Sequence, residues 1–324
     1  MSDIITMGEA LIDFVPKRKD VSLDDNEAFF RRLGGAPANV AVGVARLGVD
    51  SLFMGKVGQD AFGEYIINTL NDYGVNTECV KQTDRANTCI SFIVLDENGE
   101  RDFVFYRNSS ADLYYCEEDV NIEVFNEAKI FHFGSLSLTA EPIREATYKC
   151  IAFARDNGLL LSYDPNYRAS LWPDRKTAQK WIKDGLGRAE IVKLSVEELE
   201  LITGTADPEK GISVLCDEFY NLKLIFVTLG SDGCYYKGSS SEEYIQGFNV
   251  DVEDTTGSGD AFTATVLSSL VWDDLFQLDN IGEDTLKNIV VRANAAGALT
   301  ACGKGAIFSL PSWKEIRKLA AWRR

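Results

Sequence analysis

Residues 250–270 read VDVEDTTGSGDAFTATVLSSL, and this stretch indicates the fold more strongly than any other part of the chain. A strand-like run, VDV, leads through a turn of small residues into an apolar helix. In such a turn, backbone N–H groups and the positive end of the helix dipole favour phosphate oxygens. Asp260, in the first helical turn, would repel a phosphate but is suited to accept a proton from an attacking hydroxyl. Alternatively, Asp260 only caps the helix, as aspartate often does.

This turn matches neither of two common nucleotide-binding motifs. The Walker A pattern GxxxxGK[ST] does not occur in the chain, and GSGDAF (257–262) lacks the third glycine of GxGxxG. Phosphate chemistry at this turn would therefore need another class of glycine loop.

Strand-like runs alternate with amphipathic helical stretches over most of the chain. This order predicts an α/β fold, a parallel sheet with helices on both faces, built from residues 1–10, 33–86 and 109–324. Residues 11–32 and 87–108 interrupt it with short strands and a β-hairpin. We expect these two inserts to form a β-sheet lid at the ligand-binding edge of the main sheet. The alternative is a surface hairpin with no role beyond stability or dimerisation.

Charge and composition exclude several classes of protein. The 324 residues include 33 Lys and Arg against 50 Asp and Glu, a formal net charge of −17, which opposes binding to nucleic acid or an acidic membrane. No apolar run approaches the ~18–20 residues of a membrane helix, and the start of the chain lacks a basic secretory leader. We therefore expect a cytoplasmic protein. The single histidine, His132, and seven scattered cysteines favour structural roles over a zinc site or a catalytic triad.

Polar residues at other strand and helix ends are further candidates for ligand contacts. Gly34 and Gly35 precede a predicted helix, and Asn39 in its early turns offers both a donor and an acceptor to hydroxyls. Asp13, in GEALIDF, is suited to accept two sugar hydroxyls. Arg168, after the strand-like LLL and the loop SYDPNY, is suited to hold a hydroxyl or a transferring phosphate. Ordinary turns and loop–helix junctions remain the alternative for each.

Two stretches together resemble the signatures of a known family. GGAPANVAVGVARLG (34–48) is similar to the N-terminal motif of the ribokinase/PfkB carbohydrate kinases, and DTTGSGDAF (254–262) to their C-terminal motif D-T-x-G-A-G-D. With MGEALIDFVP (7–16) and DPNYRASLW (164–172), the chain is most similar to the bacterial fructokinase branch. The resemblance covers essentially the whole length. It implies a Rossmann-like three-layer αβα domain with a β-sheet lid.

The resemblance implies transfer of the γ-phosphate of ATP to a primary hydroxyl of a small sugar, D-fructose in the first place. Asp260 falls on the family's catalytic base, and the backbone amides of Gly257, Ser258 and Gly259 fall on its anion hole. Sugar contacts are implied for Asp13, Gly34, Gly35, Asn39, Arg107 and Arg168.

The resemblance also implies positions for the nucleotide and for metal ions. Ser195 and Glu198 match the Asn-x-x-Glu motif that organises Mg²⁺ and phosphates, with serine in place of asparagine. The nucleotide positions are Ser195, Thr228, Gly230, Gly233 and Asn294. The residues similar to a monovalent-cation loop, which makes K⁺ a further candidate cofactor, are Asp254, Thr256, Thr300, Gly303, Gly305 and Ser309.

Several alternatives stay open within this resemblance. Kinases of 2-keto-3-deoxygluconate, ribose or aminoimidazole riboside share much of the same motif sequence. A catalytically inactive sugar or nucleotide sensor would keep the same fold. Some relatives dimerise through their lid sheets, so a homodimer through residues 11–32 and 87–108 is also open. The expected partners are a sugar and ATP, without nucleic acid or membrane.

Overall fold

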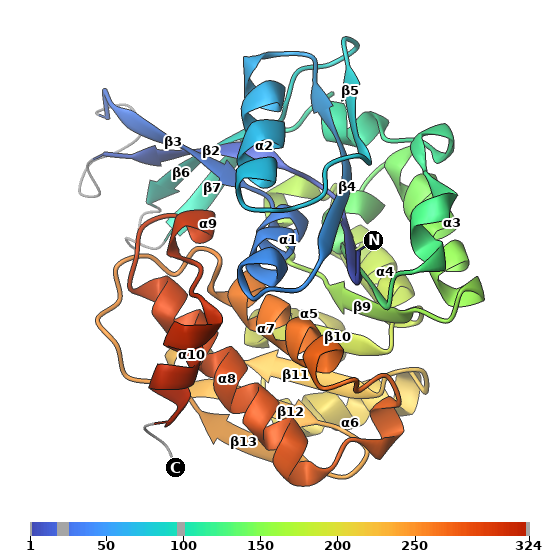
Figure 1. Ribbon diagram of the computed structural model, residues 1–324, viewed down its shortest axis with the longest axis vertical. Helices are drawn as coiled ribbons and strands as arrows, with labels where there is room; N and C mark the ends of the chain where they lie inside the picture. The colour runs from blue at the N-terminus through green and yellow to red at the C-terminus, as the bar shows by residue number, and fades with distance from the viewer. Residues whose placement is uncertain (1, 18–25, 96–100, 322–324) are drawn as a thin grey trace.

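The structure is a computed structural model that describes residues 2–17, 26–95 and 101–321. The DENG turn of the expected hairpin (96–99) and most of the polar stretch between the first lid strands lie outside these residues. Within them, the largest feature is a nine-stranded sheet in the order β13-β12-β11-β10-β9-β8-β1-β4-β5 (Figure 1). Its strands are β1 (Ile4–Met7), β4 (Ser51–Gly58), β5 (Val80–Thr83), β8 (Ile130–Gly134), β9 (Leu160–Asp164), β10 (Ile191–Ser195), β11 (Leu224–Thr228), β12 (Gly233–Lys237) and β13 (Glu242–Gln246).

Helices cover both faces of this sheet, as the alternating sequence pattern predicts. Neighbouring residues of a strand point to opposite faces. Ile4 therefore packs among residues of α1, α7 and α8, whereas Ile5 packs among residues of α3 to α6. The helices are α1 (Ala36–Arg46), α2 (Ala61–Asp72), α3 (Ile143–Asp156), α4 (Arg175–Leu186), α5 (Val196–Thr203), α6 (Pro208–Glu218), α7 (Ser258–Trp272), α8 (Glu283–Ala301), α9 (Ala306–Ser309) and α10 (Trp313–Ala320).

One edge of the main sheet differs from the expected parallel arrangement. The strands from β11 to β5 pair in parallel, but β12 and β13 pair antiparallel with their neighbours. The chain reverses after β11 at Gly233, which has φ 116° and whose Cβ, if present, would lie 2.1 Å from the carbonyl oxygen of Ile245. Only glycine fits this reversal without a large shift of the backbone.

A second sheet of four strands has the order β3-β2-β6-β7. It comes from the two segments that interrupt the α/β pattern: β2 (Leu11–Pro16), β3 (Phe29–Gly34), β6 (Ile90–Leu95) and β7 (Arg101–Tyr106). On one face, Phe14 stacks on Phe92 at 5.0 Å and meets Phe62 of α2 edge-on at 5.9 Å. The register places Asp13, Ser91 and Phe105 in one row on the other face.

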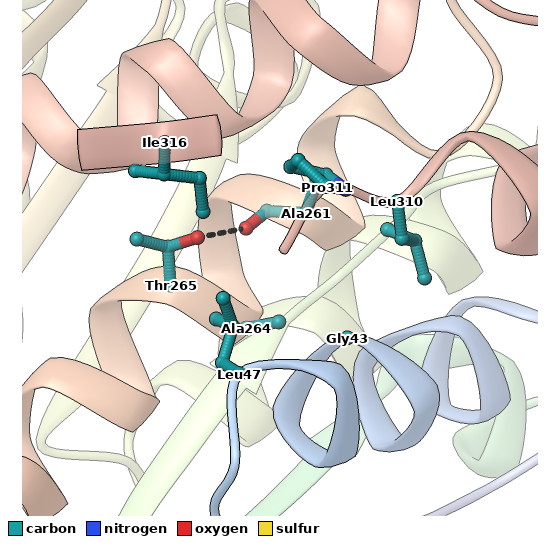
Figure 2. Close-up of a pocket in the computed structure, with 8 residues that line it drawn as sticks. All are labelled: Gly43, Leu47, Ala261, Ala264, Thr265, Leu310, Pro311 and Ile316. Atoms are coloured by element: carbon teal, nitrogen blue, oxygen red, sulfur yellow. Dashed lines mark hydrogen bonds between the residues drawn. The ribbon is translucent and has the colours of Figure 1, made fainter. Parts of the chain in front are cut away.

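Helices α1 and α7 pack unusually closely. A Cβ on Gly43 would lie 2.6 Å from the Cβ of Ala264, so a larger residue at position 43 would push the helices apart. Figure 2 shows a small, mostly apolar pocket beside this contact, in which the Thr265 hydroxyl donates to the carbonyl oxygen of Ala261 at 2.8 Å. The close approach brings the N-terminal turns of both helices together. Among the described residues, no helix is long and apolar enough to cross a bilayer.

Candidate active site

The N-termini of α1 and α7 bring two polar side chains into direct contact. The side-chain amide of Asn39 donates a 2.7 Å hydrogen bond to Oδ2 of Asp260, which is 6% exposed, and Asn166 donates to Oδ1 at 3.4 Å. Burial raises the pKa of Asp260 to about 6, although the Asn39 hydrogen bond opposes this effect. Oδ1 of Asn39 is buried and has no partner within the part of the chain that the structure describes. It is therefore available as an acceptor.

The turn that precedes Asp260 has the geometry of an anion site. Gly257 adopts the left-handed conformation (φ 83°), and a Cβ there would lie 2.5 Å from that of Ala306. The Ser258 amide donates to the carbonyl oxygen of Thr255 at 3.1 Å, which shapes the turn. The amides of Gly259 and Asp260 lie in the first helical turn, where N–H groups have no acceptor within the helix. Together with the helix dipole, they favour a phosphate at this position.

Asp13 lies on β2 against the start of α1. Its carboxylate accepts a hydrogen bond from the Ser91 hydroxyl, and a Cβ on Gly34 would lie 2.1 Å from Oδ2 of Asp13. Gly35 has φ 103°, and its Cβ would lie 2.3 Å from the carbonyl oxygen of Glu9. The two glycines are thus required for this close approach. Burial raises the pKa of Asp13 to about 6, opposed by Ser91 and by the charge of Arg168.

Arg168 lies close enough to both Asp13 and Asp260 for its charge to act on them. Its positive charge lowers the pKa of both Asp13 and Asp260, against the larger raising effect of their burial. Its guanidinium lies over the ring of Phe103 on β7, 5.4 Å from the ring centre. The loop after β9, the second sheet and the N-terminus of α7 therefore surround one polar site.

Two charged residues of this site were not among the sequence candidates. The Lys193 ammonium, on β10, bonds to both carboxylate oxygens of Asp164 at 3.1 and 3.0 Å, and the Thr263 hydroxyl contacts the same carboxylate at 3.4 Å. The only sequence signal for Lys193 is a single charge inside the apolar run IVKLS (191–195).

Glu198 and Ser195 form a reciprocal cap at the start of α5. The Glu198 carboxylate accepts the amides of Ser195 at 2.8 Å and Tyr167 at 2.7 Å, while the Ser195 hydroxyl accepts the Glu198 amide at 3.2 Å. Burial raises the pKa of Glu198, and the charge of Lys193 opposes this. Among the described residues, no group of three or more His, Cys, Asp or Glu side chains is placed to hold a metal alone. Mg²⁺ usually binds one or two carboxylates together with water and substrate phosphates, and Glu198 fits that role.

The expected nucleotide residues lie at the ends of β10 and β11, in the loop that follows β11, and on α8. Ser195 and Thr228 are paired in the register of β10 and β11, and the Thr228 hydroxyl donates to the carbonyl oxygen of Leu194 at 3.3 Å. Gly230 (φ 60°) follows in the loop before β12. Asn294 on α8 is buried and donates to the carbonyl oxygen of Ile245 at 3.1 Å. Asn294 thus joins α8 to β13 beside this loop.

Comparison with known proteins identifies the family. Residues 1–313 match the profile described as pfkB family carbohydrate kinase. The chain belongs to this family. This confirms the resemblance of the two motifs and the expected ribokinase-like α/β fold.

Individual PfkB relatives match over nearly the whole chain. It is 43% identical over 318 residues to probable fructokinase-4 of Arabidopsis thaliana, covering 98% of this chain and 96% of that protein. The crystal structure of fructokinase with bound ATP from Xylella fastidiosa superposes with a TM-score of 0.89 at 32% identity, covering 100% and 99% of the two chains. The fructokinase of Vibrio cholerae O395 with fructose, ADP and calcium ion gives 0.88 at 33% identity, covering 99% of each chain.

Arg107, one of the sugar contacts implied by the PfkB resemblance, lies just after β7 in a buried network. Its guanidinium donates to the carboxylate of Asp112 at 2.7 Å, to the Thr139 hydroxyl at 3.0 Å and to the carbonyl oxygen of Leu136 at 2.9 Å. Arginine has five N–H donors, so three are engaged here. In this arrangement Arg107 joins the end of the second sheet to the α/β domain.

The residues similar to the PfkB monovalent-cation loop lie in two neighbouring segments. The Asp254 carboxylate accepts the amide of Thr256 at 3.0 Å and that of Gly305 at 3.1 Å, which holds the segments together. The remaining residues, at the end of α8 and after it, are Thr300, Gly303 and Ser309. A Cβ on Gly303 would lie 2.3 Å from the Ser309 hydroxyl oxygen, so this second segment is tightly folded.

Proposed function

We propose that this protein transfers the γ-phosphate of ATP to a primary hydroxyl of D-fructose. The observation that supports this most strongly is the buried Asp260 carboxylate, held by Asn39 at the helix N-terminus that forms the anion site. Full-length similarity to proteins named fructokinases supports the choice of sugar.

In this proposal the sugar lies between the second sheet and the start of α1. The Asp13 carboxylate and Oδ1 of Asn39 accept sugar hydroxyls, and Gly34 and Gly35 let the sugar approach the backbone closely. Arg168, positioned by its contact with Phe103 on β7, donates to a hydroxyl or to the transferring phosphate. A buried polar group that is left without a hydrogen-bond partner costs free energy. Such a site therefore rejects ligands that lack the matching hydroxyl.

Asp260 acts as the base in the proposed reaction. As the sugar oxygen attacks the γ-phosphorus, its proton passes to the Asp260 carboxylate, the bond from phosphorus to the bridging oxygen breaks, and ADP leaves. The amides of Gly259 and Asp260 in this turn stabilise the negative charge that develops on the phosphoryl oxygens. Asn39 fixes the orientation of the carboxylate through its hydrogen bond to Oδ2.

The nucleotide lies along the edge formed by Ser195, Thr228, Gly230, Gly233 and Asn294 in this proposal. Mg²⁺, when bound, would neutralise phosphate charge at this edge. Glu198, whose carboxylate is fixed by the amides of Tyr167 and Ser195, would hold it through water. We assign a monovalent cation such as K⁺ to the two segments joined by Asp254.

We assign the second sheet as the lid of the site. The face that holds Asp13 and Ser91 is the one turned toward the substrate, and closure would exclude water as a competing acceptor. On the opposite face, Tyr106 and Val104 are 59% and 38% exposed. We propose that a second copy of the chain covers this face. Sedimentation velocity at micromolar concentration should show a dimer, and a monomer would contradict this point.

The substrate is tested with a panel of acceptors and ATP consumption as the readout. We expect kcat/KM to be highest for fructose. Equal or better values for ribose, 2-keto-3-deoxygluconate or aminoimidazole riboside would contradict the assignment of the sugar. A folded protein that turns over none of these acceptors would support a sensor instead of an enzyme. We propose a cytoplasmic location because the reaction consumes ATP, and cell fractionation would test it.

A further inference from the structure

A buried ammonium group lies directly behind the 257–260 turn. Lys193, on the central strand β10, is 9% exposed, and its Nζ is 3.2 Å from the position that a Cβ on Gly259 would occupy. The absence of a side chain at position 259 thus lets the ammonium approach the anion site. Neither the PfkB motifs nor the reaction steps proposed above use this lysine.

Asp164 and α7 hold the Lys193 ammonium in one place. Lysine has a long flexible stem, so a fixed position requires partners. Both carboxylate oxygens of Asp164, at the end of β9, bond to Nζ within 3.1 Å. The Thr263 hydroxyl of α7 contacts the same carboxylate at 3.4 Å. The ion pair therefore connects two strands of the sheet with the helix that presents Asp260.

Carboxylates outnumber basic groups around the Lys193 ammonium. The titratable and charged groups of this region are His132 on β8, Asp164 on β9, Arg168 in the following loop, Glu198 on α5 and Asp260 on α7. Burial lowers the pKa of His132 to about 4, so it is neutral at pH 7. Three carboxylates thus face two fixed cations, and a triphosphate would add further negative charge.

The two members of the ion pair have opposite effects on the base. Burial raises the pKa of Asp260 most; of the charged neighbours, Asp164 raises it further, whereas Lys193 and Arg168 lower it. Although burial alone would lower the pKa of Lys193, the surrounding carboxylates raise it, so the ammonium stays charged.

We propose that Lys193 is a positioning residue of the phosphoryl-transfer site. Its positive charge keeps Asp260 ionised and offsets the negative charge of the carboxylates beside which a triphosphate would bind. This inference rests on the kinase function proposed above. Lys193 acts through Asp260 and through the local potential, and it takes no proton and forms no bond during the transfer.

The test compares Lys193→Met, Lys193→Arg and Asp164→Asn by the pH dependence of kcat/KM and by the KM for ATP. Lys193→Met should move the acid limb of kcat/KM to higher pH by about 1 unit and raise the KM for ATP, because a nearby cation is lost. Asp164→Asn should move the limb to lower pH. Lys193→Arg, which retains the charge, should keep the wild-type limb.

A matched control is Lys56→Met. Lys56 on β4 is also 9% exposed, and it bonds to Asp119 and to the carbonyl oxygen of Tyr114. This control should lose stability without any movement of the limb. Unmoved limbs in Lys193→Met and Asp164→Asn would overturn the inference. If Lys193→Met does not fold, the direction of the shift in Asp164→Asn and the unshifted limb of Lys193→Arg decide instead. Wild-type protein without turnover on any acceptor would contradict the kinase function itself.

Discussion

The side-chain amide of Asn39 donates a 2.7 Å hydrogen bond to Oδ2 of Asp260, a residue 221 positions further along the chain. This contact depends on the close packing of α1 against α7, where Gly43 faces Ala264. The proposed base is therefore oriented by the packing of two helices as well as by its own turn.

Removal of the Asn39 amide should weaken catalysis and change its pH dependence. In Asn39→Ala, Asp260 loses a hydrogen bond that lowers its pKa. The acid limb of kcat/KM should therefore move to higher pH, and kcat/KM should fall about 10- to 100-fold, the usual weight of a hydrogen bond to a charged group. Asn157→Ala, at an exposed asparagine after α3, serves as the control. An unchanged limb in Asn39→Ala would show that the amide does not act on the base.

The wild-type protein should lose activity below about pH 6. Asp260 must be ionised to accept the proton, and burial raises its pKa to about 6 in the free protein, which is the state that kcat/KM reports. Burial also raises the pKa of Asp13 to about 6. Asp13→Asn should therefore remove one of the two ionisations that shape the acid limb of kcat/KM. Activity that remains constant down to pH 5, with circular dichroism showing a folded protein, would contradict both carboxylate assignments.

Gly43→Val should separate α1 from α7. A Cβ at this position would already lie 2.6 Å from the Cβ of Ala264, so the larger side chain should cost about 1–3 kcal/mol of stability. It should also lower kcat in the fraction that remains folded, since Asn39 moves away from Asp260. Thermal melting and kcat are measured together. The control is Gly187→Ala, at an exposed glycine with φ −65° whose added Cβ would have its nearest neighbour at 3.6 Å, and it should change neither quantity appreciably.

Glu9→Gln should increase stability more at high pH than at low pH. Burial raises the pKa of Glu9 from 4.5 to about 7, although the charge of Arg107 opposes this. The folded state thus binds this proton more tightly than the unfolded state, and wild-type stability falls as pH rises through this interval, by at most about 3 kcal/mol. Glutamine keeps the acceptor for the Ala36 amide without the charge.

Urea unfolding of Glu9→Gln and wild type at pH 5 and pH 8 measures this difference. The exposed glutamate variant Glu78→Gln is the control. A gain in stability that is equal at both pH values would contradict the buried, titrating carboxyl.

The fold and the backbone of the two glycine-containing turns were predictable because their signals are local in the sequence. The small residues of the 254–262 turn and of the 34–39 loop require a specific backbone, and both segments adopt it. Alternating apolar runs predicted the layered α/β fold and the separate sheet. The antiparallel edge was missed because β13 (EEYIQ) has little apolar character and follows a polar loop.

The remaining parts of the site depend on contacts that no local pattern encodes. Lys193 lies in an apolar strand, and only the neighbouring strand supplies its partner Asp164. Asn166, with φ 46°, reaches Asp260 from a loop 94 positions away. The sequence pattern likewise could not show that Arg107, expected as a sugar contact, is paired with Asp112. Long-range packing decides each of these positions.

Turnover of Asp260→Asn with ATP and fructose tests the central claim most directly. Asparagine preserves the size of the side chain and a hydrogen-bonding partner for Asn39, but it cannot accept the proton of the sugar hydroxyl. The account predicts a folded protein whose kcat is lower by about 10²–10⁴, the usual weight of general base catalysis. Wild-type turnover by a folded Asp260→Asn protein would contradict the assignment of the base.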